Sequence, residues 1–247
     1  MLASIPSRRS LELLGAAVVA GGLAGAAFTA GVRRERRESK RLHRTLVQLL
    51  LNTLSSGDPV TARHSLRVAD LTDALAEALA LPPREQATLR VAALLHDMGK
   101  IDDRFFHIIH SRSPLSKRQR AEIKQHPCES AHILEPLEPV HPEISRIVAS
   151  HHECWNGSGY PNGRAGEEIP LAARIISVAD VFDAVTQPRA YHDPLSVEEA
   201  FEVLREDAGS KFDPAIVALL ERAAVRKRWA QIARSGLEEE ERVQGRA

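Results

Sequence analysis

Histidine and aspartate are the residues of this chain best suited to chemistry, because they are numerous and clustered. The sequence contains eleven histidines. Seven His and Asp residues fall at or near the ends of predicted apolar helices: His64, His96, Asp97, His126, His151, His152 and Asp180. Imidazole and carboxylate groups together bind borderline divalent metals such as iron, manganese and zinc. One histidine on an apolar face is more often a core residue than a ligand, so the accumulation is what predicts a metal site.

Seven candidate ligands exceed the needs of one ion and suit two ions that share a bridging carboxylate. Two metals about 3.5–4 Å apart commonly serve in-line attack on a phosphate ester. The residue types therefore predict a di-metal site, with phosphate-ester hydrolysis as its chemistry.

Motifs in a fixed order along residues 55–222 resemble those of a known family. They are His96-Asp97-Met98-Gly99-Lys100, His126-Pro127, the loop 151–161 with Gly159-Tyr160-Pro161, the blocks 169–175 and 179–184, and Phe212-Asp213-Pro214. The set resembles the HD superfamily of metal-dependent phosphohydrolases. It is most similar to the HD-GYP subgroup, which hydrolyses the bacterial second messenger cyclic di-GMP.

The resemblance implies which residues hold the metals. One ion is expected at the four residues that match the basic HD site: His64, His96, Asp97 and Asp180. The second ion is expected at three histidines, with Asp97 as the bridge: His126, His151 and His152. The family favours iron or manganese. Some relatives hold a third metal through a glutamate at the position of Val60, which cannot bind a cation, so two divalent ions are expected.

The resemblance also implies catalytic roles for Asp97, Lys100 and Asp183. Lys100 matches a lysine beside the scissile phosphate, where a cation offsets charge that develops on the phosphoryl oxygens. Asp183 lies three residues after Asp180, on the same helix face. It either exchanges a proton with the bridging water or accepts a hydrogen bond behind a metal ligand.

Four residues are expected to bind the substrate: Lys100, Tyr160, Arg189 and His192. Tyr160 either stacks on the nucleotide or belongs to a rigid turn behind the histidines. Arg189 keeps the first cation of the family pattern, whereas His192 replaces a second arginine. A neutral imidazole is a weaker phosphate partner than a guanidinium, so affinity for a doubly charged dinucleotide is expected to fall.

The expected function is therefore hydrolysis of cyclic di-GMP to linear pGpG, with a further step to GMP left open, by attack of a metal-bridging hydroxide. Two alternatives stay open at the level of sequence. The same metal site could act on another nucleotide, a reading that His192 favours. Alternatively, the domain could be a non-catalytic cyclic di-GMP receptor or interaction module.

The elements that must position these residues are predicted to be helices. Val68, Leu71, Leu75 and Leu79 follow helical spacing, with His64 on the same face. Ser116 with Gln119, and Ser196 with Glu199, are capping boxes that start later helices. No convincing strand is found, so we expect an all-α fold: an HD-domain helical bundle with an HD-GYP extension over residues 56–222.

Composition excludes several other classes of protein. Aromatic residues make up only 4% of the chain, which is low for a β-sandwich. Two cysteines cannot form a disulfide framework, which excludes the class of small secreted proteins. Lys plus Arg and Asp plus Glu number 33 each, so no global basic field favours a nucleic acid polymer as partner. Residues 223–247 are predicted to be a charged carboxy-terminal tail, frayed from Glu238 onward.

The amino-terminal segment predicts a membrane anchor. Residues 13–32 carry no charge, and a basic block follows, so we expect a single transmembrane helix within residues 1–32 and a basic juxtamembrane helix over 33–55. The positive-inside rule then keeps the catalytic domain in the cytoplasm, on the bacterial inner membrane. Gly21 and Gly25 could pack two anchors as a homodimer. A cleaved signal peptide and an ordinary core helix are the competing readings.

Overall fold

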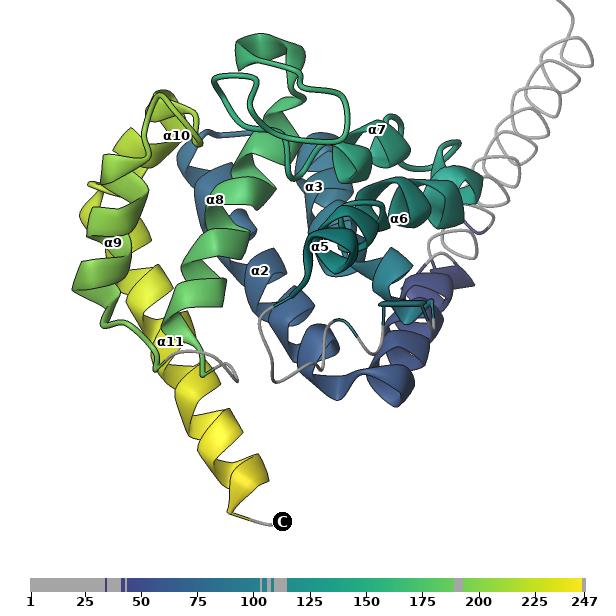
Figure 1. The fold of residues 1–247 in the computed structure, drawn as a ribbon, viewed down its shortest axis with the longest axis horizontal. Helices are drawn as coiled ribbons and strands as arrows, with labels where there is room; N and C mark the ends of the chain where they lie inside the picture. The colour runs from purple at the N-terminus through teal and green to yellow at the C-terminus, as the bar shows by residue number, and fades with distance from the viewer. Residues whose placement is uncertain are drawn as a thin grey trace, which may run out of the picture. The chain divides into compact units, whose positions relative to one another are not determined.

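The described part of the chain comprises residues 34, 41–42, 44–102, 104–105, 108, 115–188 and 193–245 of the computed structural model (Figure 1). The chain divides into two units, Met1–Leu49 and Leu50–Ala247, and the seven candidate metal ligands all belong to the second. The anchor predicted within residues 1–32 lies outside the described residues, as do Arg189 and His192. None of the described helices is long and apolar enough to span a bilayer.

Helices make up the regular structure of the described residues. Residues 44–57 are helical. The labelled elements that follow are α2 (Pro59–Ala78), α3 (Pro83–Leu95), η1 (Met98–Ile101), α5 (Lys117–Ile123), α6 (His126–Leu134), η2 (Glu135–Leu137), α7 (Ile144–Ala149), η3 (Gly166–Glu168), α8 (Leu171–Thr186), α9 (Val197–Glu206), α10 (Pro214–Leu219) and α11 (Ala223–Gln244). Over the same described ranges, extended pairing amounts to two isolated bridges, Asn156 with Ala165 and Ala208 with Phe212. The all-α prediction is confirmed.

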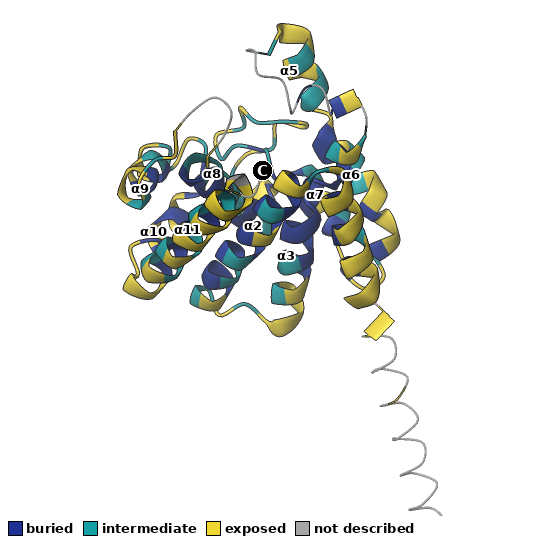
Figure 2. Cartoon of the chain, turned by 90° about the horizontal axis from the view of Figure 1, so that it is seen from below, coloured by how far each residue is buried: buried dark blue, intermediate teal, exposed yellow. Residues whose placement is uncertain are grey.

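The core forms around α2, which packs against α3, α8 and α11. Val68, Leu71 and Leu75 on α2 are fully buried, as the helical spacing predicts. Figure 2 shows buried residues concentrated on α2 and α3, in the middle of the helices. His64 is buried on α2 as well, so the first candidate ligand is held by the same apolar face that folds the domain.

Local capping fixes where several helices begin. The Asp58 carboxylate accepts hydrogen bonds from the backbone N–H groups of Val60 and Thr61, which starts α2. Both predicted capping boxes are present, at the starts of α5 and α9. Such caps satisfy backbone donors that have no partner inside the helix, so these starting points are set locally by sequence.

Residues 223–247 are predicted as a charged tail that is frayed from Glu238 onward, but the structure continues a helix to Gln244. Residues 223–244 form α11, and Val225, Trp229 and Ala233 at spacing four are buried. The Trp229 indole N–H donates to the Leu71 carbonyl at 3.0 Å. Most charged residues of this segment are exposed, and Glu240 is half-buried, so composition alone suggested a solvated tail.

Candidate metal centre

One group of potential ligands gathers where α2, the end of α3 and α8 meet. His64, His96 and Asp97 each offer a ligand atom, and these atoms lie within 4.8 Å of one another. Asp180 on α8 joins them, since its Oδ1 lies 3.1 Å from His64 Nε2. Chain segments more than a hundred residues apart in sequence thus supply one cluster.

A second group lies beside the first. His126 at the start of α6 and His151 and His152 after α7 form it, again with ligand atoms within 4.8 Å. Asp97 stands between the groups, because its Oδ2 is 3.4 Å from His96 Nε2 and its Oδ1 is 3.2 Å from His126 Nε2. This is the position a bridging carboxylate needs. All seven residues singled out by sequence are therefore brought together.

Three of the histidine rings are oriented by the same kind of hydrogen bond to the backbone. The Nδ1 atoms of His96, His126 and His151 lie 2.8, 2.6 and 2.6 Å from the backbone carbonyl three residues earlier. A carbonyl only accepts, so each Nδ1 carries a proton, and in the neutral imidazole each Nε2 then presents a lone pair. A neutral imidazole fixed in this way is the form in which histidine binds a metal.

Several buried acceptor atoms consequently face one another. His126 Nε2 lies 3.3 Å from His151 Nε2 and 3.2 Å from Asp97 Oδ1. His96 Nε2 and Asp97 Oδ1 are buried without a hydrogen-bond partner. Buried polar atoms are normally paired, and an unpaired one is costly. A cation among these atoms would satisfy them together, so the donor set fits divalent metal ions.

The electrostatics keep most of these groups in their metal-binding forms. Burial, together with the neighbouring histidines, holds the pKa of His151 well below its ordinary value. Burial lowers the pKa of His152 to about 3. Burial opposes ionisation of Asp97, but the positive charge of Lys100 is the largest opposing cause, and the pKa of Asp97 lies well below 3.8. His151 and His152 therefore stay neutral close to an ionised Asp97.

Asp183 lies behind His64. Its Oδ1 accepts from Arg67 Nε at 2.7 Å, and its Oδ2 accepts from Arg67 Nη2 at 3.0 Å. Oδ2 also lies 2.7 Å from His64 Nδ1. With both oxygens engaged and the side chain buried, Asp183 has the geometry of a hydrogen-bond acceptor behind a ligand. Arg67 was not identified from sequence, although it follows His64 by three residues on the same helix face.

Lys100 and Tyr160 lie at the edge of the cluster. Lys100 Nζ donates to Asp97 Oδ2 at 2.6 Å, and the lysine side chain is 22% exposed. The Tyr160 ring lies 4.9 Å from the His152 ring, and Lys124 Nζ lies 4.9 Å from the Tyr160 ring centroid. Sequence alone does not predict a role for Lys124, because nothing in its local sequence separates it from the charged residues of the preceding helix α5.

The loop that carries Tyr160 is fixed by backbone hydrogen bonds. The buried carboxylate of Glu153 accepts from the N–H groups of Asn162 at 2.7 Å and Arg164 at 3.1 Å. A Cβ on Gly159 would lie 2.2 Å from the backbone N of Cys154. The turn is thus packed against the residues that follow His152, and the Glu153 carboxylate holds it.

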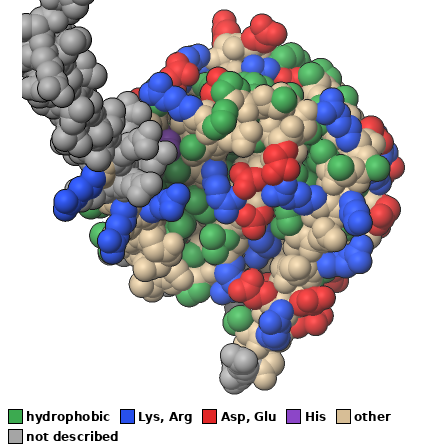
Figure 3. Space-filling view, turned by 180° about the vertical axis from the view of Figure 1, so that it is seen from behind, with side chains coloured by type: hydrophobic (Ala, Val, Ile, Leu, Met, Phe, Trp, Pro, Cys, Tyr) green, Lys and Arg blue, Asp and Glu red, His purple; other side chains and the backbone are tan. Residues whose placement is uncertain are grey.

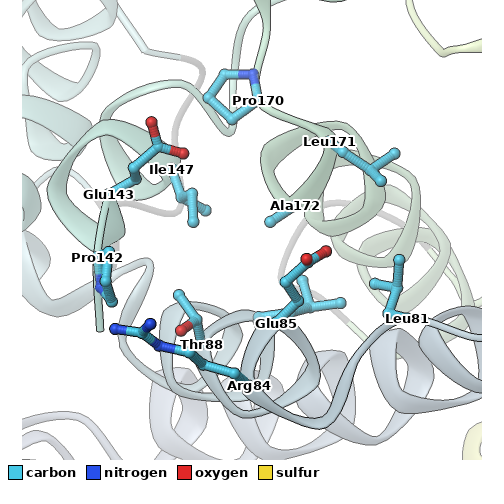
Figure 4. Close-up of a pocket in the computed structure, with 11 residues that line it drawn as sticks. Leu81, Arg84, Glu85, Thr88, Pro142, Glu143, Ile147, Pro170, Leu171 and Ala172 are labelled. Atoms are coloured by element: carbon cyan, nitrogen blue, oxygen red, sulfur yellow. The ribbon is translucent and has the colours of Figure 1, made fainter. Parts of the chain in front are cut away.

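A separate pocket of about 400 Å³ lies between α3, α7 and the start of α8 (Figure 4). Its lining includes Arg84, Thr88, Pro142, Ile147 and Leu171. None of the seven candidate ligands contributes to it, so this cavity is distinct from the metal centre.

The described residues thus form an all-helical domain around a His/Asp cluster that fits divalent metal ions, as the sequence predicts for an HD metal-dependent phosphohydrolase. The family described as "HD domain" matches residues 48–216. The chain belongs to the HD domain family, and the resemblance of its motifs to the HD-GYP subgroup is confirmed.

Curated relatives support the same conclusion. The chain is 36% identical over 165 residues to a 3′3′-cGAMP-specific phosphodiesterase 3 of Vibrio cholerae, a match that covers 67% of this chain and 35% of the relative. It is 34% identical over 190 residues to a cyclic di-GMP phosphodiesterase response regulator of Xanthomonas campestris, covering 75% and 48%. A cyclic di-GMP phosphodiesterase of Thermotoga maritima is 36% identical over 172 residues, covering 68% and 46%. The chain thus spans less than half the length of these relatives.

Solved structures share the fold. An HDG"Y"P protein from Bdellovibrio bacteriovorus aligns with a TM-score of 0.53 at 25% identity, covering 64% of this chain and 50% of that one. A cyclic GMP-AMP phosphodiesterase from Vibrio cholerae aligns with a TM-score of 0.58 at 22% identity, covering 74% and 49%.

Proposed function

We propose that this chain is a metal-dependent phosphodiesterase that hydrolyses cyclic di-GMP to linear pGpG. The observation that supports this most directly is the Asp97 carboxylate between two histidine groups whose Nε2 lone pairs face inward. Relatives named cyclic di-GMP phosphodiesterases share about a third of their residues with the chain over this domain. The proposed metals are two divalent ions, iron or manganese.

When bound, two such ions lower the pKa of water and stabilise charge on a phosphate ester. The residues of the chain would do the rest. Lys100, partly exposed beside Asp97, is placed to contact a phosphoryl oxygen as negative charge develops there. Tyr160, beside His152, offers an aromatic face to a guanine base. Asp183 and Arg67 hold the His64 ring in place.

The second candidate substrate is 3′3′-cGAMP. Two relatives with 36% identity bear the name of a phosphodiesterase specific for that dinucleotide. Both dinucleotides offer the same phosphodiester to the metal centre and differ in one base. The discrimination therefore falls to residues that touch the bases and not to the seven ligands.

One experiment tests both candidates. The full chain is purified, its metal content measured, and cyclic di-GMP and 3′3′-cGAMP are offered separately to the manganese- or iron-loaded protein. We expect two metal equivalents and a linear dinucleotide product, with chromatography recording any further step to GMP. Binding of cyclic di-GMP without turnover by metal-loaded protein would instead establish a receptor.

We also propose that residues 1–32 anchor the protein in the inner membrane, with the catalytic domain in the cytoplasm. The support is the sequence alone: twenty uncharged residues from Leu13 to Val32, with the larger basic block after them. Figure 3 shows Lys and Arg interspersed with Asp and Glu on one face of the molecule. That mixture gives no support to a nucleic acid polymer as partner.

A further inference from the structure

The carboxy-terminal half of α11 contacts the residues behind His64, although α11 lies beyond the HD family match at 48–216. Glu240 accepts two hydrogen bonds from Arg63, at 2.8 and 3.1 Å. Arg67 Nη1 lies 3.8 Å from Glu240 Oε1. Arg67 Nε and Nη2 in turn donate hydrogen bonds to the Asp183 carboxylate. A connected set of charges thus runs from α11 through α2 to α8.

Gly236 explains how α11 comes so close. Glycine is a poor helix former, yet this residue lies inside α11 and is buried. A Cβ there would lie 2.7 Å from Arg67 Cδ and 2.7 Å from Gln187 Oε1. Gln187 Nε2 also donates to the Ala233 carbonyl at 3.1 Å. The backbone of α11 therefore forms the wall against which the Arg67 side chain rests.

The contact with α11 matters because Arg67 is a buried cation that holds the Asp183 carboxylate in place. Its Nη1 has no hydrogen-bond partner. The position of the guanidinium therefore depends on the hydrogen bonds to Asp183 on one side and on the packing of α11 on the other. A shift of Arg67 would move the Asp183 carboxylate, which fixes the Nδ1 side of His64 at 2.7 Å. Partners that orient a ligand imidazole commonly set metal affinity.

We propose that α11 is a positioning element of the metal centre: Gly236 and Glu240 hold Arg67, Arg67 holds Asp183, and Asp183 orients His64. The inference rests on the proposed di-metal centre. It assigns a role in metal binding to a helix that the family match does not include. None of these residues is proposed to touch the substrate.

The test compares Glu240→Ala and Gly236→Ala with Glu241→Gln, an exposed neighbour on the same helix. Manganese titration of the full chain should show one ion bound about tenfold more weakly in both test variants, with the other ion unchanged. Glu241→Gln should match wild type. Since Gly236→Ala raises helix propensity, its loss of affinity would come from the displaced Arg67 or Gln187 side chain and not from a poorer helix. Glu240→Gln, which keeps an acceptor oxygen, should restore part of the affinity.

A readout on the metal-free protein separates this inference from the proposed function. Nitrogen-15 NMR of the histidine rings should show the His64 Nδ1–H signal broadened or shifted in both test variants, while the signal of His151 stays in place. If wild-type protein bound no metal, the proposed function would be contradicted. The His64 signal of the metal-free protein would then still test whether α11 positions His64. Wild-type metal affinities together with an unchanged His64 signal in both variants would overturn the role of α11. Equal weakening of both ions would also overturn it, since that indicates general destabilisation.

Discussion

At the scale of single residues, the centre depends on acceptor atoms held where they have no protein partner. His96 Nε2 and Asp97 Oδ1 are buried and unpaired, and the backbone carbonyls of Ala93, Ile123 and Val148 fix the neighbouring rings. Such an arrangement costs free energy in the absence of a cation. We therefore expect metal binding to stabilise the fold, as any ligand that binds only the native state does.

Asp97 and Lys100 should respond differently to mutation. Asp97→Ala removes the carboxylate placed between both groups, so we expect loss of activity and of bound metal. Lys100→Ala leaves every proposed ligand in place, so metal should be retained while kcat falls by roughly 10²–10³, typical for the loss of one transition-state donor. Metal analysis and steady-state kinetics on the two variants check this. Near-normal turnover by Asp97→Ala would contradict the two-metal assignment.

His64 predicts a pH dependence for the metal-free protein. Burial opposes its protonation, but interactions with Asp180 and Asp183 outweigh burial and raise the pKa of His64 from 6.5 to about 9. Because the pKa in the folded state is raised, the stabilisation is fully present below about pH 6.5 and is lost as the pH rises through about 9. The free energy of unfolding should fall by roughly 3 kcal/mol across this window, since each pKa unit corresponds to about 1.36 kcal/mol.

Urea unfolding of the metal-free protein at several pH values measures that effect. His64→Gln is the matched control, because it removes the titrating ring and should flatten this part of the profile. If wild type and His64→Gln showed the same slope between about pH 6.5 and about pH 9, His64 would not be the group responsible.

At the scale of elements, η1 and α6 must approach closely to bring Asp97 to His126. A Cβ on Gly99 would lie 2.5 Å from the His126 carbonyl oxygen and 2.7 Å from Ser130 N. The Gly99 N–H also donates to Ser130 Oγ at 2.7 Å. Only a glycine allows this contact, so the glycine two residues after Asp97 is a packing requirement of the site.

Gly99→Ala should therefore separate η1 from α6. We expect destabilisation of about 1–3 kcal/mol, the usual cost of overpacking, and weaker metal binding. Gly57→Ala is the control, since a Cβ there meets only Ile101 Cγ1 at 3.8 Å. Thermal unfolding and metal titration of both variants measure these effects. If the two variants had the same stability and metal affinity, the close approach of η1 to α6 would not be needed.

The same scale shows what sequence reasoning could and could not reach. Helical periodicity and capping boxes are local signals, so α2, α5 and α9 were predictable. The seven ligands were found through residue type and motif order. Arg67 and Glu153 were not, because their roles arise only when α8 and the 153–164 loop fold back on them. The place of α11 depends on tertiary packing of Trp229, which a charged composition conceals.

At the scale of the whole molecule, the metal centre draws every proposed ligand from residues 64 to 180, inside the unit Leu50–Ala247. The charged residues behind these ligands extend to Glu240 in α11, which contacts Arg63 and Arg67. The chain spans 35% to 48% of the length of the relatives compared with it. The proposed catalysis and the proposed membrane attachment should be separable, because every candidate ligand lies after Leu50 and the proposed anchor lies before residue 33.

Deleting residues 1–32 tests that separation. If those residues form an anchor, the full chain should stay in the membrane fraction through a high-salt wash, because burial in hydrocarbon is not screened by ions. A tether through the basic residues 33–44 alone would be released, since its attraction falls off within a Debye length of about 8–10 Å. The shortened chain should appear in the soluble fraction and still bind two metal ions and turn over substrate. Release of the full chain by salt would refute the anchor, and loss of metal binding on deletion would refute the separation.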